Sequence, residues 1–370
     1  MLVGVPKEIK PQESRVGLVP GSVSEVIRVG GRVIVEKNAG MGIGITDQQY
    51  QAAGAEVVDS AAEIFERAEL IVKVKEPQPD ECKRLHEGQI IFTYLHLAPD
   101  PNQTRLLKES GVTAIAYETV TQKEGGLPLL TPMSQVAGRM SIQAGAHCLE
   151  IAQGGSGILL GGVPGVSPGN VLVIGGGVVG TNAVLMAMGM ETHVTVLDKS
   201  LSRLRELNFQ FGSKLNTIYA TADALEHYIA TADLIVGAIL VPGAAAPKLV
   251  TRAMLKTMRP GSVIVDVAID QGGCFETSRP TTHHQPTYLV DGVVHYCVAN
   301  MPGAVPRTST FALNNATLPF VLSIVTRGMK SALLSDNHFL NGLNVHRGKI
   351  TYEAVARELG YDYVPAVDAL

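Results

Sequence analysis

The sequence has few cysteines and lacks the residue spacings that hold metals. Its four cysteines lie far apart, and none belongs to a Cys-x-x-Cys pair; they are Cys82, Cys148, Cys274 and Cys297. In a chain of 370 residues we therefore expect reduced, buried thiols rather than a disulfide framework. Because no cluster of histidine, cysteine or acid has the spacing of metal ligands, we predict no metal site.

No stretch of the chain concentrates lysine and arginine. The 30 basic and 34 acidic residues leave a formal net charge of −4. Nucleic acids and anionic lipids are usually bound by basic patches, so this balance argues against either as the main partner. The N-terminal run MLVGVPKEIK has no long apolar core after a basic segment and is not a signal peptide. We therefore expect a cytoplasmic protein.

Residues 151–190 contain no charged side chain. A hydropathy window could mistake this stretch for a membrane span. However, glycines and prolines interrupt it repeatedly, as at Gly161, Pro164 and Pro168. The pattern favours a helix end, a loop, a buried strand and a buried helix of an α/β protein, so we predict no membrane segment.

The centre of the chain carries a glycine-rich turn in a specific setting. Residues 170–198 read NVLVIGGGVVGTNAVLMAMGMETHVTVLD. The order is an apolar strand, a turn with Gly175, Gly177 and Gly180, an apolar helix, a second strand, and Asp198. Such a turn lets backbone N–H groups approach a pyrophosphate, and an acid about twenty residues on can hold the ribose hydroxyls. A plain turn is the alternative, but the full context favours dinucleotide binding.

Strands alternate with helices on both sides of this motif. The alternation predicts an α/β protein with two doubly wound, Rossmann-like domains joined by two long helices, at residues 132–153 and 308–333. We expect residues 134–301 to form the nucleotide-binding Rossmann domain. Residues 1–133 and 302–370 would form a discontinuous substrate or catalytic domain.

Four polar residues could carry chemistry. Lys75 and His96 end apolar runs, and ligands bind at the carboxyl ends of strands in such sheets. Arg15 could grip a carboxylate with a bidentate fork, and Asp270 could orient a water or an ammonia. Each also has an ordinary explanation, namely a solvated arginine, a strand-end lysine, a structural histidine and a turn aspartate. Together with a nicotinamide cofactor they would support hydride and proton transfer.

The sequence resembles the alanine dehydrogenases, within a wider family that also contains the nucleotide subunit of proton-translocating transhydrogenases. The matching runs follow in order along nearly the whole chain. They include GVPKE, KVKEP, FTYLHLA, PLLTPMSQVAGR, the glycine fingerprint, MRPGSVIVDVAIDQGGCFETSRPTTH and YCVANMPGAVPRTST.

The resemblance implies roles for individual residues. Arg15 and Lys75 would hold the substrate carboxylate and carbonyl oxygen, and His96 would be the catalytic acid and base with Asp270 as its partner. An apolar wall and a polar contact are implied for Met133 and Asn300. The implied cofactor-binding residues are Ser134, Gly175, Gly177, Val178, Gly180, Asp198, Arg203, Leu240, Val267, Ile269, Asp270, Val298 and Met301.

Two positions depart from the family pattern. Ala220 stands where many members have a serine near the adenosine. Arg327 stands where some members have a histidine that binds a divalent ion together with an acid matching Glu118, so we do not predict that metal site. Asp198 favours NAD over NADP because a carboxylate repels a 2′-phosphate, although Lys199 and Arg203 lie close to it in sequence.

We therefore expect an NAD-dependent L-alanine dehydrogenase that converts L-alanine reversibly to pyruvate and ammonia, and by resemblance a homo-oligomer, a hexamer. One alternative is a transhydrogenase-type nucleotide subunit, which needs a membrane partner and no amino-acid site. The other is a protein that binds NAD but has lost the chemistry.

Overall fold

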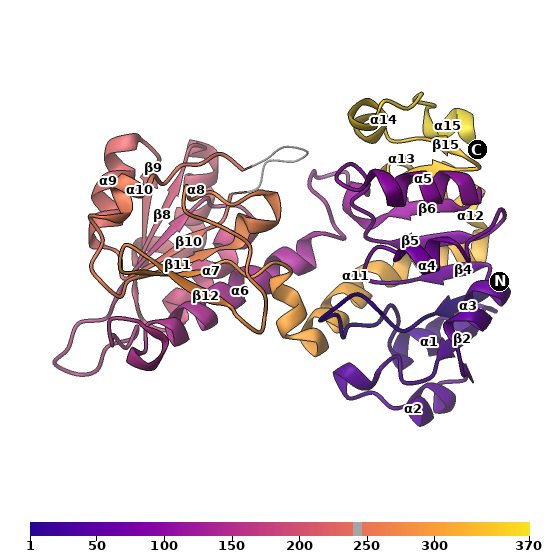
Figure 1. Ribbon diagram of the computed structural model, residues 1–370, viewed down its shortest axis with the longest axis horizontal. Coiled ribbons are helices and arrows are strands. Elements are labelled where there is room, and N and C mark those ends of the chain that lie inside the picture. The colour runs from indigo at the N-terminus through magenta and orange to yellow at the C-terminus, as the bar shows by residue number, and fades with distance from the viewer. Residues whose placement is uncertain (240–245) are drawn as a thin grey trace. The chain divides into compact units, whose positions relative to one another are not determined.

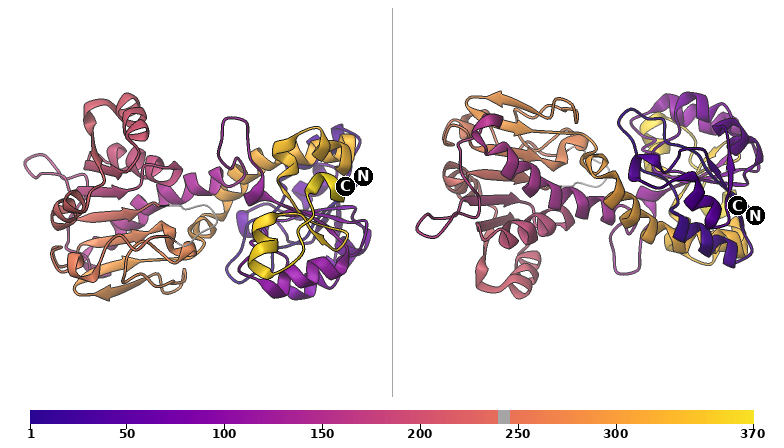
Figure 2. Two further views of the ribbon diagram at one scale, coloured as in Figure 1. Left: turned by 90° about the horizontal axis from the view of Figure 1, so that it is seen from above. Right: turned by 90° about the horizontal axis from the view of Figure 1, so that it is seen from below.

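A computed structural model describes residues 1–239 and 246–370. By its internal contacts the chain divides into unit 1 (Met1–Met133 and Val305–Leu370) and unit 2 (Ser134–Ala304) (Figure 1). Each unit contains a largely parallel sheet with helices on both faces, as the further views in Figure 2 also show. The predicted class of two doubly wound, Rossmann-like folds is confirmed. The substrate-binding and nucleotide-binding roles given to the two parts stay predictions.

Unit 1, all of which the structure describes, has an eight-stranded sheet in the order β15-β14-β6-β5-β4-β1-β2-β3. Its parallel strands are β1 (Leu2–Val5), β2 (Arg32–Glu36), β3 (Glu56–Val58), β4 (Leu70–Val72), β5 (Ile90–Thr93) and β6 (Thr113–Ala116). At one edge β14 (Leu343–His346) and β15 (Lys349–Ile350) are antiparallel. The strand order reverses between β1 and β4, which is where ligands bind in such sheets.

Side chains cap the N-termini of some helices of unit 1. Thr46 forms a capping box with Gln49, and Ser60 accepts from the Glu63 N–H. The first helix begins at Pro20, so Ser22 lies inside it, and the Ser22 hydroxyl donates to Asn314 Oδ1 (2.5 Å). The helices are α1 (Pro20–Arg28), α2 (Asp47–Ala52), α3 (Ala61–Arg67), α4 (Pro79–Cys82), α5 (Pro101–Ser110), α11 (Pro306–Arg327), α12 (Met329–Leu334), α13 (Asn337–Leu340), α14 (Glu353–Leu359) and α15 (Ala366–Ala369), with 3-10 turns η1 (Met41–Ile43) and η2 (Tyr117–Thr119).

In the described part of unit 2 the sheet has seven strands in the order β12-β13-β11-β10-β7-β8-β9. They are β7 (Asn170–Ile174), β8 (His193–Asp198), β9 (Leu215–Tyr219), β10 (Leu234–Gly237), β11 (Val263–Asp266), β12 (Thr287–Val290) and β13 (Val293–Tyr296), and only β12 is antiparallel to its neighbour. The described helices are α7 (Val178–Gly189), α8 (Leu201–Phe211), α9 (Ala222–Thr231) and α10 (Arg252–Leu255), with 3-10 turns η3 (Ile151–Gln153), η4 (Gly212–Lys214), η5 (Val267–Gln271) and η6 (Met301–Ala304).

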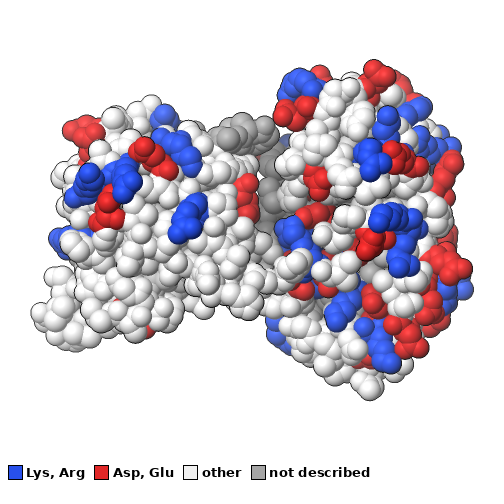
Figure 3. All heavy atoms as spheres, viewed as in Figure 1, with Lys and Arg blue, Asp and Glu red and all other residues white. Residues whose placement is uncertain are grey.

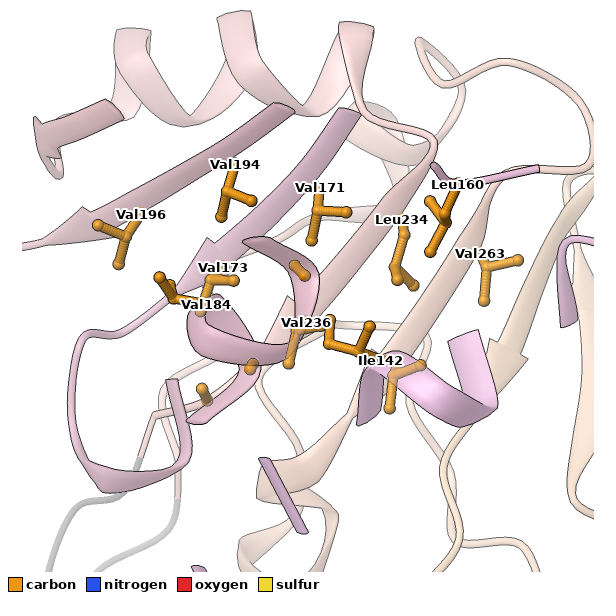
Figure 4. Packing of buried hydrophobic residues seen from close by; sticks show 14 of the residues in the cluster. Ile142, Leu160, Val171, Val173, Val184, Val194, Val196, Leu234, Val236 and Val263 are labelled. Carbon is orange, nitrogen blue, oxygen red and sulfur yellow. The ribbon is translucent and has the colours of Figure 1, made fainter. Parts of the chain in front are cut away.

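Both faces of the unit 2 sheet are buried. Val171 and Val173 of β7 belong to one apolar cluster, which Figure 4 shows, while Leu172 and Ile174 belong to a second. Because successive side chains of a strand point to opposite faces, the two clusters cover the two faces. This burial explains why these strands appear in the sequence as continuous apolar runs.

The two long helices were predicted with different ends. The first, α6 (Thr131–Cys148), carries the chain from unit 1 into unit 2, and the predicted last turn is the separate 3-10 turn η3. The second predicted helix is divided into two, α11 and α12. The break lies at Gly328, whose φ of 76° is incompatible with a continuous α-helix. Within the described residues, no helix meets the length and apolarity that a membrane crossing requires.

All four cysteines are free and buried, as predicted. Burial raises the pKa of the Cys82 thiol to about 12 and that of Cys148 to about 11. Since the thiolate is the reacting species, we expect slow reaction with Ellman's reagent in the native protein and rapid reaction of four thiols per chain after denaturation. Fewer than four equivalents from denatured, unreduced protein would contradict this prediction.

Candidate active site

Charged side chains gather at the carboxyl ends of neighbouring strands in unit 1. Glu8 follows β1, Lys73 and Lys75 follow β4, His96 follows β5, and Glu118 follows β6. These four strands are adjacent in the order β1-β4-β5-β6, so their ends meet at one edge of the sheet. The predicted substrate residues Lys75 and His96 therefore lie at the edge where such sheets bind ligands.

Arg15 is buried, with a side-chain exposure of 2%. Its Nε and Nη2 donate to the two carboxylate oxygens of Glu13 (2.7 and 2.5 Å), and its Nη1 lies 3.0 Å from Met133 Sδ. Burial lowers the pKa of Arg15, but Glu13 raises it above its usual value. The interpretation of Arg15 as a solvated loop residue is wrong. The role of Arg15 in holding a substrate carboxylate stays a prediction.

His96 is held in an uncommon backbone conformation. Its φ is 50°, a region that non-glycine residues seldom adopt. Glu118 Oε1 accepts the backbone N–H groups of His96 (2.6 Å) and Leu95 (3.1 Å), and the imidazole stacks on the Tyr94 ring at an interplanar angle of 3°. The side chain is 46% exposed. A strained backbone with an exposed imidazole is typical of a functional position.

Sequence reasoning missed several side chains that support this site. Glu8, Glu13 and Tyr94 had no assigned role, and Lys73, rather than Lys75, is the fully buried lysine after β4. The run KVKEP carries a signal for this, because it places two lysines directly after an apolar strand, and a lysine that is buried there needs a carboxylate partner.

The glycines of the turn in unit 2 differ in their structural role: the fold requires glycine at two positions but not at the third. Gly175 has a φ of 101°, and a Cβ on Gly180 would lie 1.8 Å from the Gly175 carbonyl oxygen. Among the described residues, a Cβ on Gly177, the N-cap of α7, would meet nothing within 4 Å. The fold therefore leaves this position at the helix N-terminus free for a ligand group such as a pyrophosphate.

Asp198 and Arg203 are tied to this turn. Asp198 Oδ2 accepts the Gly176 N–H (2.7 Å), and its Oδ1 accepts the Ser200 N–H (2.7 Å). Arg203 donates through Nε to the Gly176 carbonyl (2.7 Å), and it also pairs with Glu206 (2.5 Å). The predicted acid is thus at the carboxyl end of β8, beside the glycine turn.

Asp270 lies exposed in the turn η5, four residues beyond the end of β11, rather than directly at a strand end. The loop that carries it is anchored by Asp266, which sequence reasoning missed. This buried carboxylate accepts from the Ala268 and Cys274 N–H groups (3.1 and 2.9 Å) and from the Ser278 hydroxyl (2.5 Å). Burial raises the pKa of Asp266. An acid inside an otherwise apolar run was the available signal.

The remaining cofactor positions differ in exposure. Ile269, Val298 and Met301 are buried. Val178 is 41% exposed at the start of α7, and Ser134 and Val267 are half-buried. Asn300, the polar contact implied for the substrate, is also half-buried. Leu240 lies outside the described residues. All of these assignments stay predictions.

Two family models match the chain in sequence. The alanine dehydrogenase/PNT N-terminal domain matches residues 4–137, and the alanine dehydrogenase/PNT C-terminal domain matches residues 141–353. The chain belongs to the alanine dehydrogenase/PNT family. The alanine dehydrogenase of Halomonas elongata is 60% identical to it over 370 residues, covering 100% of both chains.

Solved structures of the alanine dehydrogenase/PNT family agree with the fold. An L-alanine dehydrogenase superposes with a TM-score of 0.95 at 52% identity and covers 97% of this chain and 99% of its own. A transhydrogenase from Sinorhizobium meliloti superposes with a TM-score of 0.83 at 25% identity, covering 95% and 100%.

Two departures from the family pattern can be placed in the structure. Arg327 is exposed at the end of α11 and donates to the Ser335 hydroxyl (3.3 Å). Ala220, just after β9, donates its N–H to the Asp198 carbonyl (3.0 Å). Within residues 1–239 and 246–370, histidines, cysteines and acids form no group of three that could hold a metal ion.

Proposed function

We propose that this protein is an NAD-dependent L-alanine dehydrogenase. The observation that carries the proposal is the full-length similarity to alanine dehydrogenases, combined with the complete set of implied substrate residues. Arg15, Lys75 and His96 are all present in unit 1, at or beside the ligand-binding edge of its sheet. The reaction is L-alanine + NAD⁺ + H₂O to pyruvate + NH₄⁺ + NADH + H⁺.

The glycine turn and Asp198 fit a bound dinucleotide. The open space at Gly177 leaves room for a pyrophosphate at the N-terminus of α7, where N–H donors and the helix dipole favour negative charge. When bound, NAD supplies the acceptor for the hydride that leaves the alanine Cα, and NADH returns it in the reverse direction. The fit supports a nucleotide site in unit 2.

The partners of the Arg203 guanidinium support NAD rather than NADP as the cofactor. Its guanidinium donates to the Gly176 carbonyl and the Thr181 hydroxyl and pairs with Glu206. A guanidinium with these partners is poorly placed to neutralise a 2′-phosphate. Asp198 would repel such a phosphate, while its oxygens can accept ribose hydroxyls.

The substrate residues would divide the remaining work. Arg15 would hold the carboxylate, and Lys75 would polarise the carbonyl or imine, where charge develops during the reaction. His96 would take protons from the amine and the attacking water and give one to the departing ammonia, with Asp270 as its proposed partner. Met133 would limit the space for the substrate side chain. By resemblance we also propose a hexamer that works in the cytoplasm.

The test is NADH absorbance decay with pyruvate, with and without ammonium, repeated with NADPH. We expect decay only when pyruvate and ammonium are both present, and faster decay with NADH. Decay with pyruvate alone would indicate a hydroxy-acid dehydrogenase. No decay with any combination would favour a transhydrogenase-type nucleotide subunit or a non-catalytic NAD-binding protein.

A further inference from the structure

Three charged side chains are buried beside the segment that carries Lys75. Lys73 Nζ donates to Glu8 Oε2 (3.1 Å) and to Glu81 Oε1 (2.8 Å), and the three side chains are 0%, 2% and 4% exposed. Burial lowers the pKa of Lys73, but the two carboxylates raise it above its usual value. Buried charges are costly to desolvate and contribute little net stability as a group. This cluster has no part in the chemistry proposed above.

Glu8 connects the buried cluster to the backbone of the predicted substrate lysine. Its Oε1 accepts the N–H of Val74 (2.6 Å) and the N–H of Lys75 (3.3 Å). On the other side, the Lys75 carbonyl accepts the Thr93 hydroxyl (2.9 Å). The peptide groups before and after the Lys75 Cα are both anchored, so the direction in which the side chain leaves the backbone is fixed.

We propose that Glu8 is a positioning residue for Lys75. One of its carboxylate oxygens accepts the backbone N–H groups of Val74 and Lys75, and the other accepts from Lys73. Glu81 in turn fixes the Lys73 ammonium. The inference rests on the proposed function, because it requires Lys75 to bind the substrate carbonyl oxygen. A carboxylate suits this task better than a neutral amide. It can accept hydrogen bonds at both oxygens, whereas an amide accepts at one only. Burial raises the pKa of Glu8, and the Lys73 ammonium and the Val74 N–H act in the opposite direction by favouring the carboxylate.

The test is Glu8→Gln, which keeps the size of the side chain but replaces one acceptor oxygen with a donor that faces the Lys73 ammonium. We expect the KM for pyruvate to rise roughly tenfold or more, because a small misplacement of a substrate-binding group has large kinetic effects. The Kd for NADH, measured by its fluorescence, should change by less than about twofold, since the glycine turn lies in the other unit.

A double-mutant cycle separates positioning from a purely structural role. In a Lys75→Gln background, Glu8→Gln should have almost no further effect on kcat/KM for pyruvate, because the group that it positions is gone. If the fold-losses in kcat/KM caused by Glu8→Gln and Lys75→Gln simply multiply in the double variant, the proposal is overturned. Glu8→Asp, whose shorter side chain cannot span both partners, serves in the same cycle if Glu8→Gln fails to fold.

The control is Glu56→Gln, which removes a carboxylate from a surface pair with Arg67 (2.8 and 2.7 Å) in the same unit. We expect it to leave the pyruvate KM unchanged. A folded Glu8→Gln protein with a pyruvate KM within about twofold of wild type would overturn the inference. Wild-type turnover in the same assay shows whether the proposed function itself holds, so the two failures are distinguishable.

Discussion

Replacing His96 with alanine is expected to lower kcat for reductive amination of pyruvate by roughly 10²–10⁴-fold, the usual contribution of a general acid–base group. The imidazole is 46% exposed at the ligand-binding edge, so its loss removes proton transfer without opening a core cavity. Its backbone conformation is held by Glu118 through the main-chain N–H groups, which alanine keeps. Steady-state rates with saturating NADH, pyruvate and ammonium provide the measurement.

The matched control for this variant is His86→Ala, which removes an exposed imidazole from a turn in the same unit. We expect that protein to keep wild-type kcat. A second variant, His96→Gln, retains polarity but cannot exchange protons near neutral pH, so it should be nearly as slow as His96→Ala. If His96→Ala turns over at close to the wild-type rate, the proposed mechanism is wrong.

The sequence predicted the fold class because both sheets depend on local, repeated patterns. The strands β1, β7 and β8 are short apolar runs, and Ser200 caps the helix that follows β8. The short edge strands were missed. β3 and β15 have three and two residues, too few for a period-two pattern to appear. β3 pairs with β2, about twenty residues earlier in the chain, while β15 forms a hairpin with β14.

The candidate site was only partly predictable, because the sequence does not show which side chains contact one another. A sequence indicates that Arg15 and Lys75 carry charge, but it does not say that Glu13 binds Arg15 or that Glu8 holds the Lys75 backbone. The second of these contacts joins residues 67 positions apart. The contact between Glu8 and Lys75 becomes visible only when the sheet order places β1 next to β4.

The distribution of surface charge was easier to anticipate from the sequence than the contacts of the candidate site. Basic and acidic side chains are interspersed over the face of unit 1 in Figure 3, without a large patch of one sign. This agrees with the balanced composition, from which we argued against nucleic acids and anionic lipids as main partners. Charge balance needs no long-range pairing, so composition alone is a fair guide to it.

Replacing Gly177 with alanine is expected to weaken NADH binding by about 10–100-fold, the equivalent of one lost charge-assisted hydrogen bond of about 1.5–3 kcal/mol. The new methyl group would enter the space in which we propose the pyrophosphate lies. Since that Cβ meets none of the described residues within 4 Å, the melting temperature without cofactor should stay close to wild type. Fluorescence titration with NADH and thermal unfolding measure the two quantities.

Two other glycines of the same helix complete the argument. Gly180→Ala places a Cβ 1.8 Å from the Gly175 carbonyl oxygen, so it should lower both the melting temperature and NADH affinity. Gly189→Ala adds a methyl group at the far end of α7, where nothing lies within 4 Å, and should leave NADH affinity unchanged. If only Gly177→Ala loses NADH affinity while keeping its melting temperature, the Gly177 position is needed for NADH binding and not for folding. Unchanged NADH affinity in Gly177→Ala would contradict the proposed position of the pyrophosphate.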